Sequence, residues 1–159
     1  MNKFLFFVER YGPLLFGAMI FIAALWYKSD LQQLSQEKTI SVAGLYSAVF
    51  GWASIQTGFL FSVYGFIATK NDGFLAEIRG TGAMLLVKRY TLRAMLMGFL
   101  LTIITIPLIV IGEQIVFQAQ FYLSALWFAI FAWAFAAFLR VALNFGQIIS
   151  VKDKVTIPG

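Results

Sequence analysis

Side chains that could support acid–base, nucleophilic or metal chemistry are few in this chain, and they avoid its apolar segments. The sequence contains no histidine and no cysteine, which excludes disulfides, zinc held by histidine or thiolate, histidine-ligated haem and a thiol nucleophile. Its seven acidic residues all lie at the edges of apolar runs or between them, whereas proton relays and ion-coupled transport place ionisable groups inside the membrane. We therefore expect a non-enzymatic protein that needs no cofactor or metal.

The most informative pattern is a seven-residue repeat of small residues. In the apolar run 42–69, glycine recurs at every seventh position, and serine or alanine lies three or four residues from several of these glycines. Because seven residues are close to two helical turns, the small residues form one stripe along a helix. The stripe contains Gly44, Ser47, Ala48, Gly51, Ser54, Gly58, Ser62 and Gly65. The next apolar run has the same period, at Thr91, Gly98, Thr105 and Gly112.

These small residues predict close helix packing, with two interpretations that are compatible. Apolar burial does not drive helices together inside lipid, so association depends on close backbone approach, van der Waals contact and weak hydrogen bonds. The stripe could therefore pack against the neighbouring span of the same chain. Alternatively, it could surround the symmetry axis of a homo-oligomer, where small and hydroxyl-bearing residues would line a pore.

Two residues inside the apolar runs interrupt their uniform character. Gln56 lies near the middle of the run 42–69, where an amide usually hydrogen-bonds to another helix. Pro107 removes a backbone donor from the middle of a helical run and predicts a kink there. Either residue could tune a pore, although a structural role is the simpler interpretation.

A set of basic residues is expected to lie at one membrane surface. Lys88, Arg89 and Arg93 precede one apolar run, and Arg140 follows another. These side chains can contact anionic lipid headgroups, or they can bind a soluble partner. Nucleic-acid binding is not expected, because no basic segment has the length or the aromatic interleaving of a strand-binding surface.

The elements that position these residues are predicted to be transmembrane helices. The chain has 159 residues, of which 61% are hydrophobic and 12% are charged, far from the composition of a soluble domain. Its uncharged runs are continuous and have the length of a bilayer-spanning helix. We expect spans at about 11–27, 42–69, 92–112 and 115–140, a polar outer loop at 28–38, a cytoplasmic connection at 70–91 and a cytoplasmic tail at 141–159.

The distribution of positive charge predicts the orientation. With four spans, all but two of the 12 lysines and arginines lie on the side that carries both termini, and basic loops stay in the cytoplasm. The sequence thus predicts an all-α integral membrane protein with cytoplasmic termini, helical cytoplasmic extensions and a homo-oligomeric state. A bacterial inner membrane is the expected location.

These observations leave three functional hypotheses open. The first is a homo-oligomeric pore or channel-like assembly that packs through the glycine-rich second span. The second is a membrane anchor or scaffold that recruits a soluble cytoplasmic protein through its basic inner face. The third, based on general shape alone, is a triggered membrane-perturbing effector of a stress or antiviral system. The expected partners are the lipid bilayer, other copies of the chain and, in the second hypothesis, that soluble protein.

Overall fold

The predicted all-helical fold is confirmed by a computed structural model of the protein. The structure describes residues 3–37, 39–70, 78, 80–111 and 118–150, without the side chains of residues 3–10, 111 and 118. The segments 71–77 and 112–117 and the tail 151–159 lie outside the described residues, and the predicted stripe residue Gly112 is among them.

The chain begins with two helices that meet at a sharp bend. Helix α1 spans Lys3–Trp26 and contains Pro13, and helix α2 spans Lys28–Gln36. The axes of the two helices differ by 70° across Tyr27. The sequence predicted a polar loop where α2 lies. In this helix Leu31 and Ser35, one turn apart, share the face that turns toward the rest of the protein, and the exposed residues are Ser29, Asp30, Gln33 and Gln36.

Three long helices follow. Helix α3 spans Val42–Thr69 and begins at Ser41, whose hydroxyl accepts a hydrogen bond from the Gly44 amide at 3.0 Å. Helix α5 spans Gly82–Ile111 and helix α6 spans Gln118–Ser150. Both α5 and α6 extend beyond the expected spans on the side of the termini.

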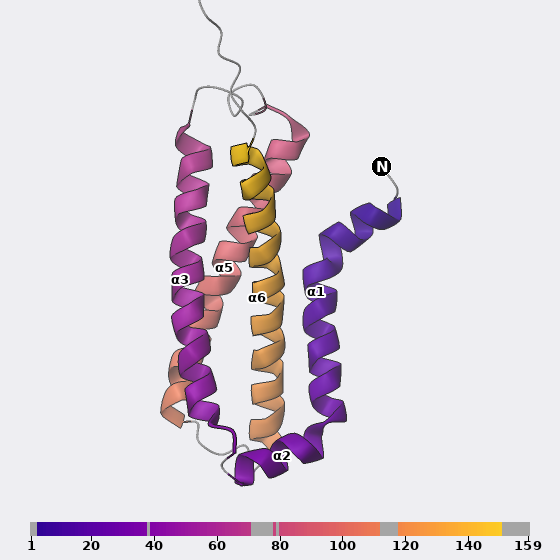
Figure 1. The fold of residues 1–159 in the computed structure, drawn as a ribbon, viewed down its shortest axis with the longest axis vertical. Helices are drawn as coiled ribbons and strands as arrows, with labels where there is room; N and C mark the ends of the chain where they lie inside the picture. The colour runs from indigo at the N-terminus through magenta and orange to yellow at the C-terminus, as the bar shows by residue number, and fades with distance from the viewer. Residues whose placement is uncertain (1–2, 38, 71–77, 79, 112–117, 151–159) are drawn as a thin grey trace, which may run out of the picture.

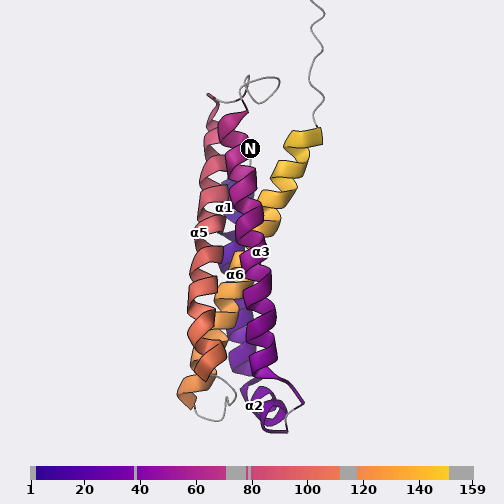
Figure 2. The same cartoon turned by 90° about the vertical axis from the view of Figure 1, so that its left-hand side faces the viewer.

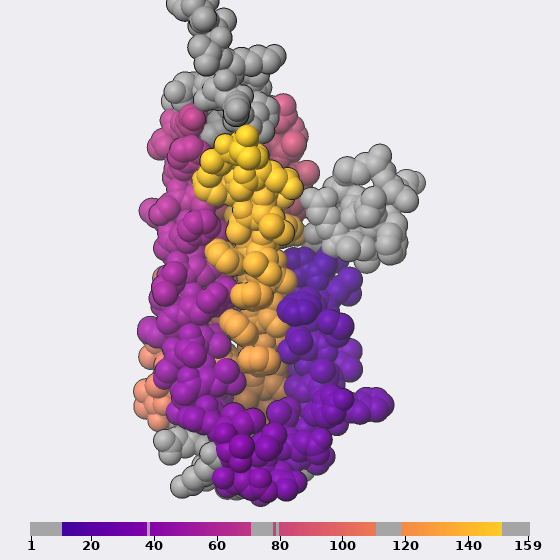
Figure 3. Space-filling view, viewed as in Figure 1, coloured from indigo at the N-terminus to yellow at the C-terminus, as the bar shows by residue number. Residues whose placement is uncertain are grey.

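The long helices form an antiparallel bundle. Figure 1 shows the start of α1, the end of α3, the start of α5 and the end of α6 at one end of the molecule, which we term the basic end. Helix α2 crosses the other end, and the space-filling view shows it covering that end (Figure 3). Helix α5 packs against α3 along its length (Figure 2), while α1 packs on α6. The buried apolar residues of α3, α5 and α6 form two clusters, one toward each end.

Fewer helices than expected have the composition of a membrane span. Among the described helices, α5 and α6 are long and apolar enough to cross a membrane, and the bent pair α1–α2 would add a third span. Helix α3 is not in this set, although it is 28 residues long. Its glycines, its serines and Gln56 lower its average hydropathy, so the same residues that suggested helix packing weaken its signal as a span.

Candidate helix-packing face and apolar pocket

One face of α3 forms the seam with α5 and α6. Its buried residues alternate at spacings of three and four, the pattern of a coiled-coil seam. They are Val42, Tyr46, Val49, Ala53, Gln56, Leu60, Val63 and Ile67. Aromatic side chains beside this seam hold α3 to α6: the rings of Trp52 and Phe131 lie 5.2 Å apart edge to face, and Phe66 and Phe145 lie 5.7 Å apart.

The glycine stripe lies on the opposite side of α3. Gly58 comes five residues after Ala53 and two after Gln56, about 140° and about 200° around the helix from these seam residues. A Cβ atom added to Gly51, Gly58 or Gly65 would have no described atom within 4 Å. The stripe therefore does not pack against the described helices of its own chain.

The other predicted residues of the stripe share this open face. Gly51 and Gly65 are partly exposed, and the remaining members are exposed: Gly44, Ser47, Ala48, Ser54, Gly58 and Ser62. The hydroxyls of Ser54 and Ser62 donate to the carbonyls of Phe50 and Gly58 in the preceding turn, at 2.9 and 3.1 Å. Both donors are thus satisfied within the helix, which leaves a small and weakly polar surface. We call this surface the open face of α3.

Two large side chains project from the open face. Ile55 is 76% exposed and Phe61 is 67% exposed, and both stand beside Gly58 on the helix surface. The face therefore carries protruding apolar residues next to positions that have no side chain at all. Knobs-into-holes packing requires a surface of this shape, with protruding side chains beside hollows.

Gly98 has the opposite environment to the glycines of α3. A Cβ atom at this position would lie 2.6 Å from Thr57 Oγ1 and 3.1 Å from Gln56 Nε2. Gln56 is buried, and its amide donates to the Ala94 carbonyl at 3.5 Å, while its Oε1 atom has no hydrogen-bond partner among the described residues. Gly98 is thus where α5 approaches the mid-helix amide of α3.

Thr105 belongs to a hydrogen-bonded connection between α5 and α6. The buried indole of Trp127 donates to Thr105 Oγ1 at 2.8 Å, and the Thr105 hydroxyl donates to the Leu101 carbonyl at 2.6 Å. Pro107 lies inside α5 two residues later, on an exposed part of the helix. The structure therefore separates these two residues, with Thr105 in the core and Pro107 outside it.

The predicted basic residues gather at the basic end but not in one cluster. Arg89 and Arg93 are exposed and one turn apart on α5, and Lys88 is partly buried. Arg140 of α6 is partly buried, and its guanidinium stacks 3.9 Å from the ring centroid of Tyr90. Arg140 also borders a hollow of about 590 Å³ between α1 and α6.

One close contact was missed by the sequence reasoning. Gly17 of α1 is buried against α6, and a Cβ atom there would lie 2.8 Å from the Ala129 carbonyl oxygen and 3.0 Å from Trp133 Cβ. The sequence contained a pattern that could have predicted this contact, because the small residues Gly17 and Ala24 are seven residues apart, the same spacing as the glycines of α3. This small residue is what lets α1 dock closely on α6.

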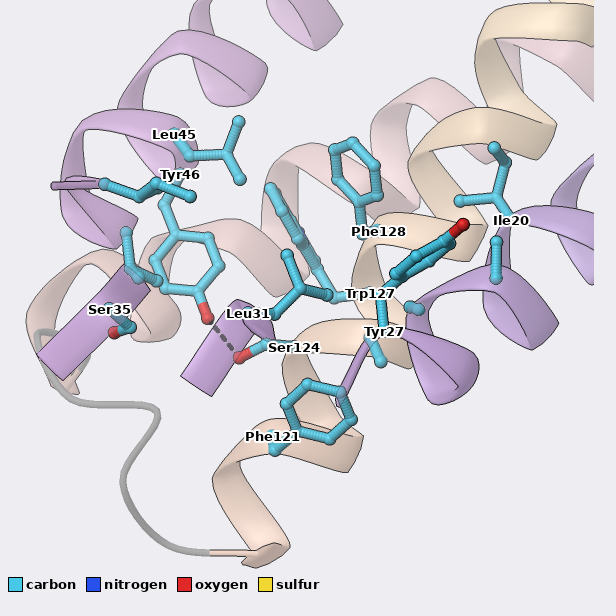
Figure 4. Close-up of a pocket in the computed structure, with 15 residues that line it drawn as sticks. Ile20, Tyr27, Leu31, Ser35, Leu45, Tyr46, Phe121, Ser124, Trp127 and Phe128 are labelled. Carbon is cyan, nitrogen blue, oxygen red and sulfur yellow. Dashed lines mark hydrogen bonds between the residues drawn. The ribbon is translucent and has the colours of Figure 1, made fainter. Parts of the chain in front are cut away.

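An apolar pocket of about 420 Å³ lies near the end of the bundle that α2 crosses. Residues from α1, α2, α3 and α6 line it, and Figure 4 shows their side chains converging on the space. The main polar feature of its wall is a 2.6 Å hydrogen bond between the hydroxyls of Tyr46 and Ser124. Tyr46 also meets Trp127 edge to face, with ring centroids 4.7 Å apart.

Comparisons with known proteins do not name a family for this chain. No family model, no curated protein and no solved structure matches it. The exposed and buried faces of its helices are therefore what can support a function.

Proposed function

We propose that the protein is an integral membrane protein whose subunits associate through the open face of α3 and enclose a pore or channel-like passage. The single observation that carries the proposal is that Gly51, Gly58 and Gly65 lie on an exposed helix face with no described atom within 4 Å of an added Cβ. A strip of small residues with glycine at every seventh position leaves space in one subunit for a second helix to pack closely.

The outer surfaces of α5 and α6 support a position in a membrane. Large apolar side chains are exposed along both helices, for example Ile103 at 50% and Val110 at 82% on α5 and Leu126 at 50% on α6. The sequence has no charged residue in 94–112 or 114–139. Exposed apolar surface on this scale needs lipid or another protein to cover it.

The bundle geometry supports α3 as a further span. Helix α3 runs beside α5 over its length (Figure 2), so a bilayer that surrounds α5 would also surround α3. The most polar side chain of α3, Gln56, is buried in the seam and does not face lipid. With α1, which meets α2 at the 70° bend, as the fourth element, four helices would cross the membrane and both termini would lie on one side.

The basic residues gathered at the basic end support an orientation with that end in the cytoplasm. Lys70, Lys88, Arg89, Arg93 and Arg140 all belong to that end, and cytoplasmic segments are enriched in such residues. A bacterial inner membrane with both termini in the cytoplasm is the location we propose.

The composition of the open face supports contact between subunits more than contact with lipid. Lipid chains pack well against branched and aromatic side chains, whereas glycine exposes backbone and leaves hollows on the helix surface. In a symmetric assembly Phe61 or Ile55 of one copy could fill the hollow at Gly58 of the next. Around a symmetry axis, the oxygens of Ser47, Ser54 and Ser62 would supply polar atoms to a central passage.

Disulfide crosslinking in membranes tests the subunit contact. The natural chain has no cysteine, so Ser54→Cys and Ser62→Cys each introduce a single thiol on the open face. We expect both variants to form covalent dimers when oxidised. Ile103→Cys, on the exposed apolar surface of α5, is the matched control and is expected to stay monomeric.

Flux through vesicles tests the passage itself. Purified protein in liposomes is expected to pass ions or a small dye. Gly58→Leu is expected to abolish this flux and, in the double variant Gly58→Leu/Ser62→Cys, to abolish the crosslinking as well. Gly146→Leu is the control, because Gly146 also has no described atom within 4 Å of an added Cβ but lies on α6. Equal crosslinking of the α3 and α5 variants, or flux unaffected by Gly58→Leu, would contradict the proposal.

A further inference from the structure

The pocket near α2 has the character of a site for a hydrocarbon chain. Its walls are almost entirely apolar. Of the four hydroxyl-bearing residues that line it, Tyr46 and Ser124 are hydrogen-bonded to each other, and the other two are Tyr27 and Ser35. Such a pocket offers water few hydrogen-bond partners. Apolar cavities of about 150 Å³ already stay dry and bind small hydrocarbons. This pocket is larger, and an empty space of its size would cost stability. An elongated apolar occupant is therefore favoured over water.

The pocket lies where a membrane interface is expected. It is lined in part by Tyr27, at the bend between α1 and α2 (Figure 4), and exposed aromatic residues lie near that bend and at the start of α6. Trp26 is 82% exposed and Tyr122 is 45% exposed. Exposed tryptophan and tyrosine collect at the level of lipid headgroups. A lipid chain in the pocket would thus leave its headgroup at the depth where headgroups belong.

A cation stands beside the pocket. Lys28 Nζ lies 5.6 Å from the ring centroid of Phe121, which lines the pocket, and 4.8 Å from the ring of Tyr122. It donates to the Tyr122 hydroxyl at 3.4 Å. The described acids at α2 are exposed and accept hydrogen bonds from residues of that helix: Asp30 from Ser29, and Glu37, which follows the helix, from Gln33. Lys28 can therefore face a phosphate without a described carboxylate between them.

We propose that this pocket binds one acyl chain of a membrane phospholipid, with the lipid phosphate beside Lys28. The site is built within one subunit, from four helices of the same chain. It rests on the membrane location proposed above, but it does not require the subunits to associate. By filling the space under α2, the lipid would hold the bend between α1 and α2 against α3 and α6.

Quenching of Trp127 by brominated lipid tests the position of the chain. Trp127 lines the pocket and is 2% exposed, so lipid outside the bundle does not reach it directly. The parent protein for this experiment carries Trp26→Phe, Trp52→Phe and Trp133→Phe. In vesicles of phosphatidylglycerol with dibrominated chains we expect strong quenching of the remaining tryptophan, relative to the same lipid without bromine.

Two alanines of α1 provide a matched pair of variants. Ala24 lines the pocket, whereas Ala18 is exposed on the same helix. Ala24→Phe fills the space and is expected to lose the quenching, and Ala18→Phe is expected to keep it. Absence of quenching in the parent, or equal quenching in both variants, would overturn the proposal.

Native mass spectrometry of the otherwise unmodified chain gives a second measurement that does not depend on the tryptophan substitutions. After detergent washing we expect one retained phospholipid per subunit, lost in Ala24→Phe and weakened in Lys28→Gln. Lys70→Gln is the control, because Lys70 also lies over an aromatic ring, that of Phe66, but at the basic end. Retention that is the same in the two lysine variants would overturn the placement of the phosphate.

The same measurement separates this proposal from the proposed assembly. Gly58→Leu is expected to retain the lipid even where it abolishes crosslinking. Loss of the lipid together with the subunit contact would show that the pocket is not a single-subunit site, and would overturn the proposal.

Discussion

Gly98 and Gly58 lie on neighbouring helices, and the two glycines differ in what surrounds them. Beside Gly98 the space for a Cβ atom is taken by Thr57 and Gln56, while beside Gly58 it is open. Sequence spacing alone placed both residues in seven-residue repeats. Only the surroundings distinguish a glycine that permits contact within the subunit from one that is available to a partner.

The residue-scale prediction is that Gly98→Ala destabilises the bundle. The added Cβ would lie 2.6 Å from Thr57 Oγ1, and overpacking of this kind costs about 1–3 kcal/mol. Thermal unfolding in detergent, followed by circular dichroism, measures the loss. The double variant Gly98→Ala/Thr57→Ala, which removes the blocking hydroxyl, is expected to recover part of the lost stability.

Gly146→Ala is the matched control for this prediction. Gly146 is inside α6 with no described atom near an added Cβ, and replacing an unstrained helical glycine by alanine stabilises by about 0.4–1 kcal/mol. If Gly98→Ala and Gly146→Ala had the same effect, the close approach of α5 to Thr57 would be refuted.

At the scale of the elements, a few polar contacts join helices that otherwise meet through apolar and aromatic side chains. The Trp127 indole reaches Thr105 on α5, and the Tyr46 hydroxyl reaches Ser124 on α6. Each contact crosses between two helices, so each fixes their register as well as adding stability. A helix pair held by aromatic stacking alone could slide with less penalty.

The element-scale prediction concerns the contact between α5 and α6. Thr105→Val leaves the buried Trp127 N–H without its acceptor, and an unsatisfied buried donor costs about 1–3 kcal/mol. Thr102→Val is the control, because the Thr102 hydroxyl donates within α5, to the Gly98 carbonyl at 2.9 Å. We expect a clear drop in unfolding temperature for the first variant and a small change for the second.

A double-mutant cycle isolates the coupling between the two side chains. Trp127→Phe combined with Thr105→Val should cost less than the sum of the single changes, by about 0.6–1.7 kcal/mol for a hydrogen bond within a membrane. Strict additivity of the two substitutions would mean that the contact does not contribute to the stability of the bundle.

For the whole molecule, the antiparallel arrangement places α2 and the basic end on opposite sides. Ser29 lies on the exposed surface of α2, and Gly80 lies between α3 and α5 at the basic end. If the bundle crosses a membrane as proposed, these two positions face different compartments. Because of the 70° bend between α1 and α2, α2 would then lie along the membrane surface and would not continue α1 across the membrane.

The whole-molecule prediction is made with single cysteines at these positions. In intact bacterial cells a membrane-impermeant maleimide is expected to label Ser29→Cys and not Gly80→Cys, and permeabilised cells should label both. The positive-inside rule is the reason, because Gly80 lies at the basic end, which the proposed orientation places in the cytoplasm. Labelling of both variants in intact cells would contradict the proposed orientation and the even number of spans.

Several features could be predicted from the amino-acid sequence because they depend on local composition. Long uncharged runs favour helices whatever lies next to them, and the all-helical fold follows from that. The positions of α5 and α6 were approximately predicted, and so was their helical extension on the side of the termini. The exact ends were not, because a helix continues past the apolar run as long as its next residues pack, as those of α6 do around Val141. Helix α2 was missed because it contains only two apolar residues, Leu31 and Leu34, which are too few to form a helical pattern in the sequence.

The tertiary arrangement was needed to orient each helix about its own axis. In the sequence, α3 has two seven-residue repeats, one of small residues and one that runs from Val42 to Ile67, and either could have formed the seam. The larger side chains form it, since they fill the space against α5 and α6 and allow aromatic contacts such as Trp52 with Phe131. The glycines are then left outside, because packing a helix by its smallest face within the subunit would leave its largest side chains without partners. The apolar pocket likewise exists only when α1, α2, α3 and α6 meet, and no periodicity in a single helix contains that information.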